Sequence, residues 1–198
     1  MQEVLLSILL TLTEIEDRET LRFVHSAEQG YDSSCGLTAL ACLMSGYWGQ
    51  SSDELSLARE FLAARIAEGD FTVSFADMKT ILAARGFTAA AYRMDWEQLR
   101  KASERYAPIL VHYTKPEGHF ALVLAADESG PIVADPASGT GAVDRALFLE
   151  RWSGFVFLAA LPGRSPNTAF MADAVALARG RLSLLERVTR DYSLGLTR

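Results

Sequence analysis

The most informative stretch of the chain is Gln29-Gly30-Tyr31-Asp32-Ser33-Ser34-Cys35-Gly36. A polar turn ends there and an apolar run begins, so the cysteine is expected at the first position of a helix. The helical spacing behind it is carried by Leu37, Leu40, Ala41, Met44 and Trp48. The free N–H groups and the dipole of a helix N-terminus stabilise a thiolate and lower the pKa of a cysteine from about 8.5. Cys35 is therefore a candidate nucleophile.

Two neighbours of Cys35 fit the same chemistry. Gly36 would leave room for a substrate backbone beside the sulfur. Gln29, six residues upstream, would direct its amide donor toward a developing oxyanion. A single cysteine is more often an inert buried thiol, so the assignment depends on the residues that accompany it.

A nucleophilic cysteine needs a base and a group that orients the base. His119 begins the apolar run Phe120-Ala121-Leu122-Val123-Leu124, and Asp135 ends the next short strand. If these strands pair, the carboxylate would lie beside the imidazole and hold its tautomer. Taken by itself, an aspartate before a proline, such as Asp135, is more often part of a turn than a catalytic group. His112 is interpreted as a core histidine, and His25 is expected on the surface or in a loop.

The second cysteine, Cys42, is predicted to be an inert buried thiol. Seven residues along one helix separate the two Cα atoms by about 10 Å. That exceeds the roughly 7 Å limit for a disulfide, so Cys35 is expected to be free. Two cysteines and three histidines without CxxC or HxxxH spacing predict no metal site, and no cofactor is expected.

Length and charge exclude several classes of protein. The chain has 198 residues and a formal net charge of −6. One compact domain is expected, and an acidic chain is a poor nucleic-acid binder. The apolar run 4–12 is far shorter than the roughly 20 residues of a membrane helix, and Glu3 does not suit a signal peptide. A cytoplasmic location is expected, with a periplasmic or exported protein as the alternative.

The order of elements predicts an α+β fold with N-terminal helices packed on a C-terminal antiparallel sheet. Capping pairs at Ser51/Glu54, Ser74/Asp77 and Asp95/Gln98 would open three of the helices. Helices are expected at 1–20, from Cys35, at 51–67, 75–85 and 95–106, and at 170–191. Strands are expected at 87–93, 108–113, 119–126, 131–134 and 155–161, with a turn at 136–141.

Together these residues resemble the C39 peptidases, papain-like "double-glycine" cysteine peptidases that process bacteriocin leaders. The resemblance covers residues 22–161. Its matching segments are Gln29 with 32–40, then 108–112, 118–124, 133–139 and 148–154. The family's nucleophile, base, orienting carboxylate and oxyanion-hole amide correspond to Cys35, His119, Asp135 and Gln29. The resemblance implies a papain-like fold; Gly36 and Gly118 are expected to contact substrate.

Some features depart from most of the family. No membrane or ATP-binding segment is expected here, which predicts a stand-alone form, and Leu37 replaces the usual Pro or Ala. Some stand-alone relatives accompany the secretion of functional amyloid. The predicted organisation is an N-terminal extension (1–21), a peptidase domain (22–162) and a linker with a C-terminal helix (163–198).

The leading hypothesis is a cysteine endopeptidase that cleaves after a small pair such as Gly-Gly in a leader or secreted protein. Its expected partners are a peptide or protein substrate and a component of a secretion system. One alternative is an amidase or acyltransferase with the same triad. A second is a non-catalytic module that binds a leader peptide or a secretion component.

Overall fold

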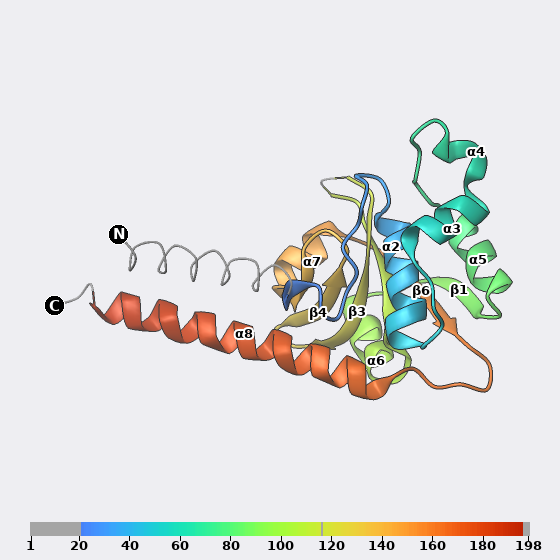
Figure 1. Ribbon diagram of the computed structural model, residues 1–198. Helices are drawn as coiled ribbons and strands as arrows, with labels where there is room; N and C mark the ends of the chain where they lie inside the picture. The colour runs from blue at the N-terminus through green and yellow to red at the C-terminus, as the bar shows by residue number, and fades with distance from the viewer. Residues whose placement is uncertain (1–20, 116, 196–198) are drawn as a thin grey trace, which may run out of the picture.

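The computed structural model describes residues 21–115 and 117–195. A six-stranded antiparallel sheet in the order β1-β6-β2-β3-β4-β5 forms the centre of the molecule (Figure 1). Its strands are β1 (Thr88–Arg93), β2 (Ile109–Tyr113), β3 (His119–Asp127), β4 (Gly130–Asp135), β5 (Gly139–Ala142) and β6 (Trp152–Ala160). The helices are α2 (Cys35–Cys42), α3 (Glu54–Phe61), α4 (Ala63–Ile66), α5 (Phe75–Ala84), α6 (Trp96–Tyr106), α7 (Arg145–Arg151) and α8 (Thr168–Gly195), and the π-helical turn η1 (Leu43–Tyr47) extends α2.

Helices cover both faces of the sheet, because alternate residues of the central strands point to opposite sides. Leu122 and Leu124 of β3 join the core beneath α2, α3 and α5, whereas Ala121 and Val123 join a second core beneath α6 and α7. The predicted α+β class and antiparallel sheet are confirmed. The prediction that helices precede the sheet was incomplete, since α6 and α7 lie between strands and cover its second face.

Most predicted helix starts are present. Capping boxes at Ser74/Asp77 and Asp95/Gln98 open α5 and α6. The capping pair predicted at Ser51/Glu54 was wrong, because Asp53 caps α3 and Ser56 returns the second bond, and the helix predicted from residue 51 begins at Glu54. Glu54 instead uses its carboxylate to accept the Gly30 N–H at 2.9 Å, which ties α3 to the loop before Cys35.

Two short elements have no strong sequence signal. The strand β5 lies where a turn was predicted, and its four residues read Gly-Thr-Gly-Ala, which carries no apolar alternation. It forms because it pairs with β4, with Asp135 opposite Gly139. The helix α7 begins at Asp144, which caps the Leu147 N–H, and it buries Phe148 against the sheet.

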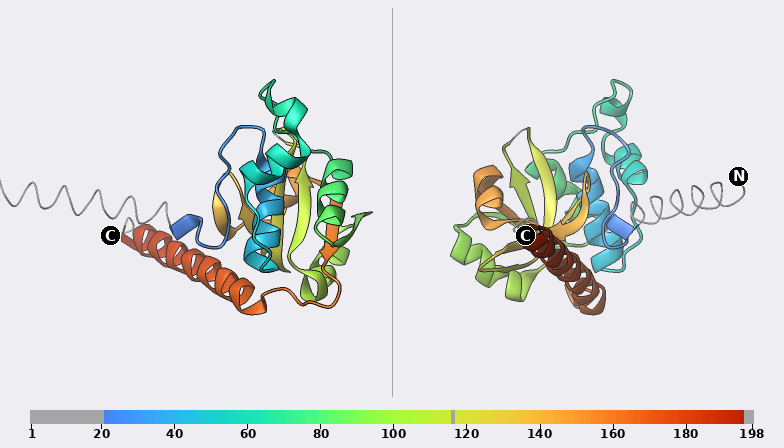
Figure 2. Two further views of the ribbon diagram at one scale, coloured as in Figure 1. Left: turned by 45° about the vertical axis from the view of Figure 1, so that its right-hand side comes forward. Right: turned by 90° about the vertical axis from the view of Figure 1, so that its left-hand side faces the viewer.

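The long helix α8 packs along the body of the molecule and then continues past it (Figures 1 and 2). Ala174 and Ala178 are buried in the contact, and Arg181 donates to the carbonyls of Thr140 and Leu21. Within residues 21–115 and 117–195, no helix combines the length and the apolar character that crossing a bilayer requires. The helix predicted at 1–20, in the predicted N-terminal extension, lies outside the described residues.

The β4–β5 turn contains a glycine that tolerates no side chain. Gly139 has φ +83°, and an added Cβ would lie 2.5 Å from the Arg22 carbonyl oxygen. We expect Gly139→Ala to destabilise the protein by about 2–3 kcal/mol, measured by urea unfolding. Gly141→Ala in the same hairpin is the matched control, because a Cβ there meets nothing within 4 Å. Equal unfolding midpoints for the two variants would contradict this account of the turn.

Candidate active site

The N-terminus of α2 has no side-chain cap. Ser34 occupies the capping position, but its hydroxyl donates to the Tyr31 carbonyl at 2.7 Å and accepts the Tyr31 N–H at 3.2 Å. The serine therefore stabilises the preceding turn. Without a capping side chain, the first N–H groups of α2 are available to a negative group at Cys35.

The sulfur of Cys35 lies against the start of β3, and its residue is 7% exposed. Burial by itself would raise the pKa of this thiol. Hydrogen bonds from His119 and from the N–H groups of Phe120 and Gly36, together with the charge on His119, outweigh burial and lower the pKa below 9.0. The surroundings of Cys35 thus favour the nucleophilic thiolate.

The other side of the imidazole meets a carboxylate. His119 Nε2 lies 3.0 Å from Asp135 Oδ1, which leaves Nδ1 for the sulfur of Cys35. Antiparallel pairing of β3 with β4 brings the two residues together, as the sequence predicted. The Ala137 N–H donates to the same oxygen at 2.7 Å and holds the carboxylate in place.

The pKa of His119 follows from these contacts. Burial lowers it, but hydrogen bonds with Asp135 and Cys35 and the charges of both partners raise it to about 9. The two shifts, downward for the pKa of Cys35 and upward for the pKa of His119, both favour the thiolate–imidazolium pair over the neutral pair. Tyr113 stacks on the imidazole, with ring centroids 6.0 Å apart and planes 8° from parallel.

Gln29 is in the loop before α2, but its amide does not contact the sulfur. Its Nε2 donates to the carbonyls of Tyr31 at 3.1 Å and Asp32 at 3.4 Å, and its Oε1 is buried without a hydrogen-bond partner. Its backbone N–H donates to the Pro136 carbonyl at 3.0 Å, so the loop is joined to the turn after Asp135. In the described part of the chain, no contact links the Gln29 side chain to Cys35.

The two glycines predicted to contact substrate have different surroundings. A Cβ at Gly36 would come within 2.3 Å of Val73 and 2.8 Å of Met78, so the chain's own side chains fill that space. Gly36 instead contributes its N–H to the sulfur of Cys35. A Cβ at Gly118 would lie 3.5 Å from His112 Nε2, an ordinary contact distance.

The prediction for His25 holds in part. His25, expected on the surface or in a loop, lies in a turn but is buried, with 6% of the residue exposed. Its ring lies 4.8 Å from the Phe170 ring, and its carbonyl accepts the Tyr47 hydroxyl at 2.7 Å. The covering residue, Phe170, belongs to α8, which is distant in sequence, so local pattern carried no signal for this burial.

The two cysteines provide a test of the thiolate. Both are free, and burial raises the pKa of Cys42 to about 12. At pH 7 we expect iodoacetamide to alkylate Cys35 at least about 100-fold faster than Cys42, as measured by mass spectrometry over a pH series. The rate at Cys35 should stay high well below pH 9. Identical pH dependence at the two cysteines would show that Cys35 is not activated.

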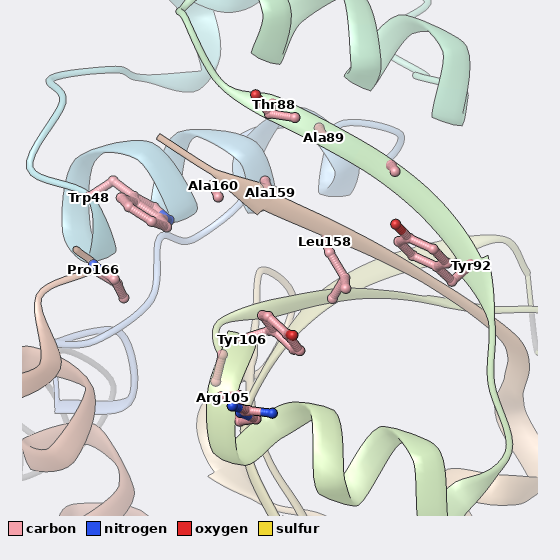
Figure 3. Close-up of a pocket in the computed structure, with 12 residues that line it drawn as sticks. Trp48, Thr88, Ala89, Tyr92, Arg105, Tyr106, Leu158, Ala159, Ala160 and Pro166 are labelled. Carbon is pink, nitrogen blue, oxygen red and sulfur yellow. The ribbon is translucent and has the colours of Figure 1, made fainter. Parts of the chain in front are cut away.

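A separate apolar hollow lies between the end of α6 and the strands β1 and β6 (Figure 3). Its volume is about 270 Å³, and its walls include Trp48, Leu158 and Tyr106. None of the residues predicted to act in catalysis lines it, so it is distinct from the site around Cys35.

Comparisons with known proteins identify the family of this chain. The model of the peptidase C39 family matches residues 24–162. A Pseudomonas aeruginosa protein named "Probable functional amyloid protease FapD" is 28% identical over 188 residues, which are 93% of this chain and 82% of that protein.

Two solved structures have the same fold. The peptidase domain of Streptococcus ComA, a bi-functional ABC transporter, aligns with a TM-score of 0.59 at 18% identity, over 69% of this chain and 97% of that domain. A double glycine motif protease from an AMS/PCAT transporter, solved with its leader peptide, aligns with a TM-score of 0.51 at 18% identity, over 68% of this chain and 89% of its own. The chain belongs to the peptidase C39 family and is a cysteine peptidase.

Proposed function

We propose that Cys35, His119 and Asp135 form the catalytic triad of an endopeptidase that cleaves after a small-residue pair such as Gly-Gly. The observation that carries the proposal is the 3.0 Å contact between His119 and Asp135 beside Cys35, whose pKa is lowered by His119 against the effect of burial. Each contact favours the charged pair that a cysteine nucleophile requires.

The proposed reaction has two halves. The thiolate of Cys35 attacks the scissile carbonyl, and the imidazolium of His119 gives its proton to the leaving amine. Water then attacks the thioester while His119 accepts one of its protons. Collapse of the intermediate expels the Cys35 thiolate, releases the acid product and restores the starting ion pair. Asp135 holds the Nε2–H of His119, so that Nδ1 exchanges the proton with sulfur and substrate.

The oxyanion would be held by two donors. One is the Cys35 backbone N–H at the start of α2, where no side chain caps the helix. The second is Gln29, which requires one amide N–H to turn from the Tyr31 and Asp32 carbonyls toward the substrate. Glu54 supports that loop through the Gly30 N–H.

The substrate class rests on the relatives. One solved neighbour is named a double glycine motif protease and was captured with a leader peptide, and a curated relative is named for functional amyloid. We infer that this chain acts on a leader or secreted protein and works with a component of a secretion system. We further propose that residues 22–162 form the peptidase domain, with α8 as an addition to it.

The carboxylate of Asp135 is expected to set the pH above which kcat/KM falls, because it raises the pKa of His119. In Asp135→Ala we expect kcat/KM to fall about 100-fold, and in Asp135→Asn by less than about 10-fold, because the amide oxygen still accepts Nε2–H. Both changes remove a charge that raises the pKa of His119, so the alkaline limb should move below pH 9. Asp127→Asn, at the other end of β3, is the matched control in the pH–rate measurement.

The proposal is tested with a peptide library that contains Gly-Gly, Gly-Ala and larger pairs at the cleavage position. Cleavage after the small pairs alone is the expected result. Transfer of the acyl group to added amines in preference to water would favour the acyltransferase. Binding of a Gly-Gly peptide that stays intact would favour the non-catalytic module.

A further inference from the structure

A second histidine lies beside the site and takes no part in the proposed triad. His112 is opposite Phe120 in the β2–β3 pairing, one register position from the Tyr113–His119 pair. Its ring is 4.9 Å from the Phe120 ring and 5.8 Å from the Phe75 ring. Since the Phe120 N–H bonds the sulfur of Cys35, His112 is one residue removed from the nucleophile.

The nitrogens of this imidazole are available. Within residues 21–115 and 117–195, none of the hydrogen bonds involves the His112 ring, although the residue is half-buried. Nε2 lies 3.5 Å from the position a Cβ on Gly118 would take. The Nε2 edge of the imidazole therefore borders the space beside Gly118, the residue before His119. Since neither ring nitrogen is among the buried polar atoms of the described residues that lack a partner, solvent reaches this edge of the ring, and a bound peptide would displace it.

The charge state of the His112 ring limits which chemical groups it can bind. Burial lowers the pKa of His112, and the positive charge on His119 lowers it further. At neutral pH the imidazole is neutral and offers one N–H donor and one acceptor nitrogen. Those groups match a peptide amide, which also has one donor and one acceptor. They suit a carboxylate or an ammonium group less well, because neither charge would be balanced here.

We propose that His112 is a substrate-binding residue, whose Nε2 accepts a hydrogen bond from a backbone N–H of the peptide next to the scissile bond. Phe75 and Phe120 hold the ring in place, and Gly118 lets the peptide backbone approach it. This assignment rests on the proposed peptidase function and adds a specific contact to it. His112 was interpreted from the sequence as a core residue. Its ring does pack against Phe75 and Phe120, but the residue is only half-buried.

The test compares two reagents for Cys35 in the full-length protein. Iodoacetamide measures the thiolate alone, whereas an acetyl-Ala-Gly-Gly chloromethyl ketone also requires peptide recognition. The variants are His112→Phe, which keeps a flat ring against Phe75 and Phe120, and His112→Gln, whose amide reaches the region of Nε2. Methylating each amide nitrogen of the ketone in turn identifies the amide that His112 binds.

In His112→Phe, the peptidyl reagent is expected to react about 10-fold more slowly, while iodoacetamide reacts within about 2-fold of the wild-type rate. His112→Gln should recover part of the loss. One N-methyl group should slow the wild type about 10-fold and leave His112→Phe almost unaffected. Because the methyl series is also run on the wild type, it tests the contact even if the phenylalanine variant folds poorly.

Three results would overturn the assignment. Parallel losses with both reagents would show that His112 acts through the thiolate or the fold. An unchanged peptidyl rate in His112→Phe, or equal effects of every methyl group in both proteins, would exclude the hydrogen bond. A wild-type protein that reacts no faster with a Gly-Gly reagent than with its Leu-Leu counterpart contradicts the small-pair specificity of the proposed function. That failure is distinguishable from a failure at His112.

Discussion

Cys35→Ala is expected to reduce peptide cleavage by about 10⁵- to 10⁶-fold while the folded structure is retained. The change removes the only atom of the site that forms a bond with the substrate, and loss of a nucleophile has effects of this size in other peptidases. The measurement is single-turnover cleavage of the best library peptide, with circular dichroism and the midpoint of unfolding as checks on the fold.

The natural control for Cys35→Ala is Cys42→Ala. This second thiol is in the same helix, has its pKa raised to about 12, and lies away from His119. Its removal should leave the cleavage rate within about 2-fold of the wild-type value. Cleavage by Cys35→Ala at more than about 1% of the wild-type rate, absent from a mock purification, would mean that another group is the nucleophile.

His119→Ala is expected to lower kcat/KM by at least about 10³-fold, because the substitution removes both the general acid and the charge that stabilises the thiolate. The pKa of Cys35 should change in a defined direction. Burial raises it, and the hydrogen bond and charge of His119 are the main opposing contributions. Without them, the pKa should rise toward or above 9.0, and alkylation at pH 7 should become slow.

The wild-type pH–rate curve completes this second prediction. Cleavage needs the Cys35 thiolate and the His119 imidazolium together, so activity should rise through the lowered pKa of the thiol and fall near pH 9. His119→Ala should lose the alkaline fall along with most of the rate. If the variant keeps a low-pH thiolate in the alkylation assay, the helix N-terminus alone activates Cys35, and His119 acts only in proton transfer.

Local features of the sequence predicted much of this site. The start of a helix at Cys35 was predicted from the change between a polar turn and an apolar run, and the capping pairs of α5 and α6 were also predicted from local sequence. The strand starts at His119 and the strand end at Asp135 were visible as changes in apolar pattern. Such signals depend on neighbours within about four residues, which is the range of helix caps and strand alternation.

Other features required the tertiary structure. The 3.0 Å contact between His119 and Asp135 depends on the register of β3 with β4, which contains a bulge between Val123 and Ala125. The burial of His25 depends on Phe170 in α8. The orientation of the Gln29 amide depends on competing carbonyls in its own loop.

The sequence by itself therefore determined which residues can carry out the chemistry and which local element each begins or ends. The tertiary structure alone decided which of their atoms meet. The physical reason is the range of the interactions: propensity and capping act between neighbours in the chain, whereas strand register and helix packing join segments whose separation in sequence leaves no local pattern. The neighbours of His112 come from two separate segments, around Phe75 and around Gly118 and Phe120, so the surroundings of this ring are known only once the chain has folded.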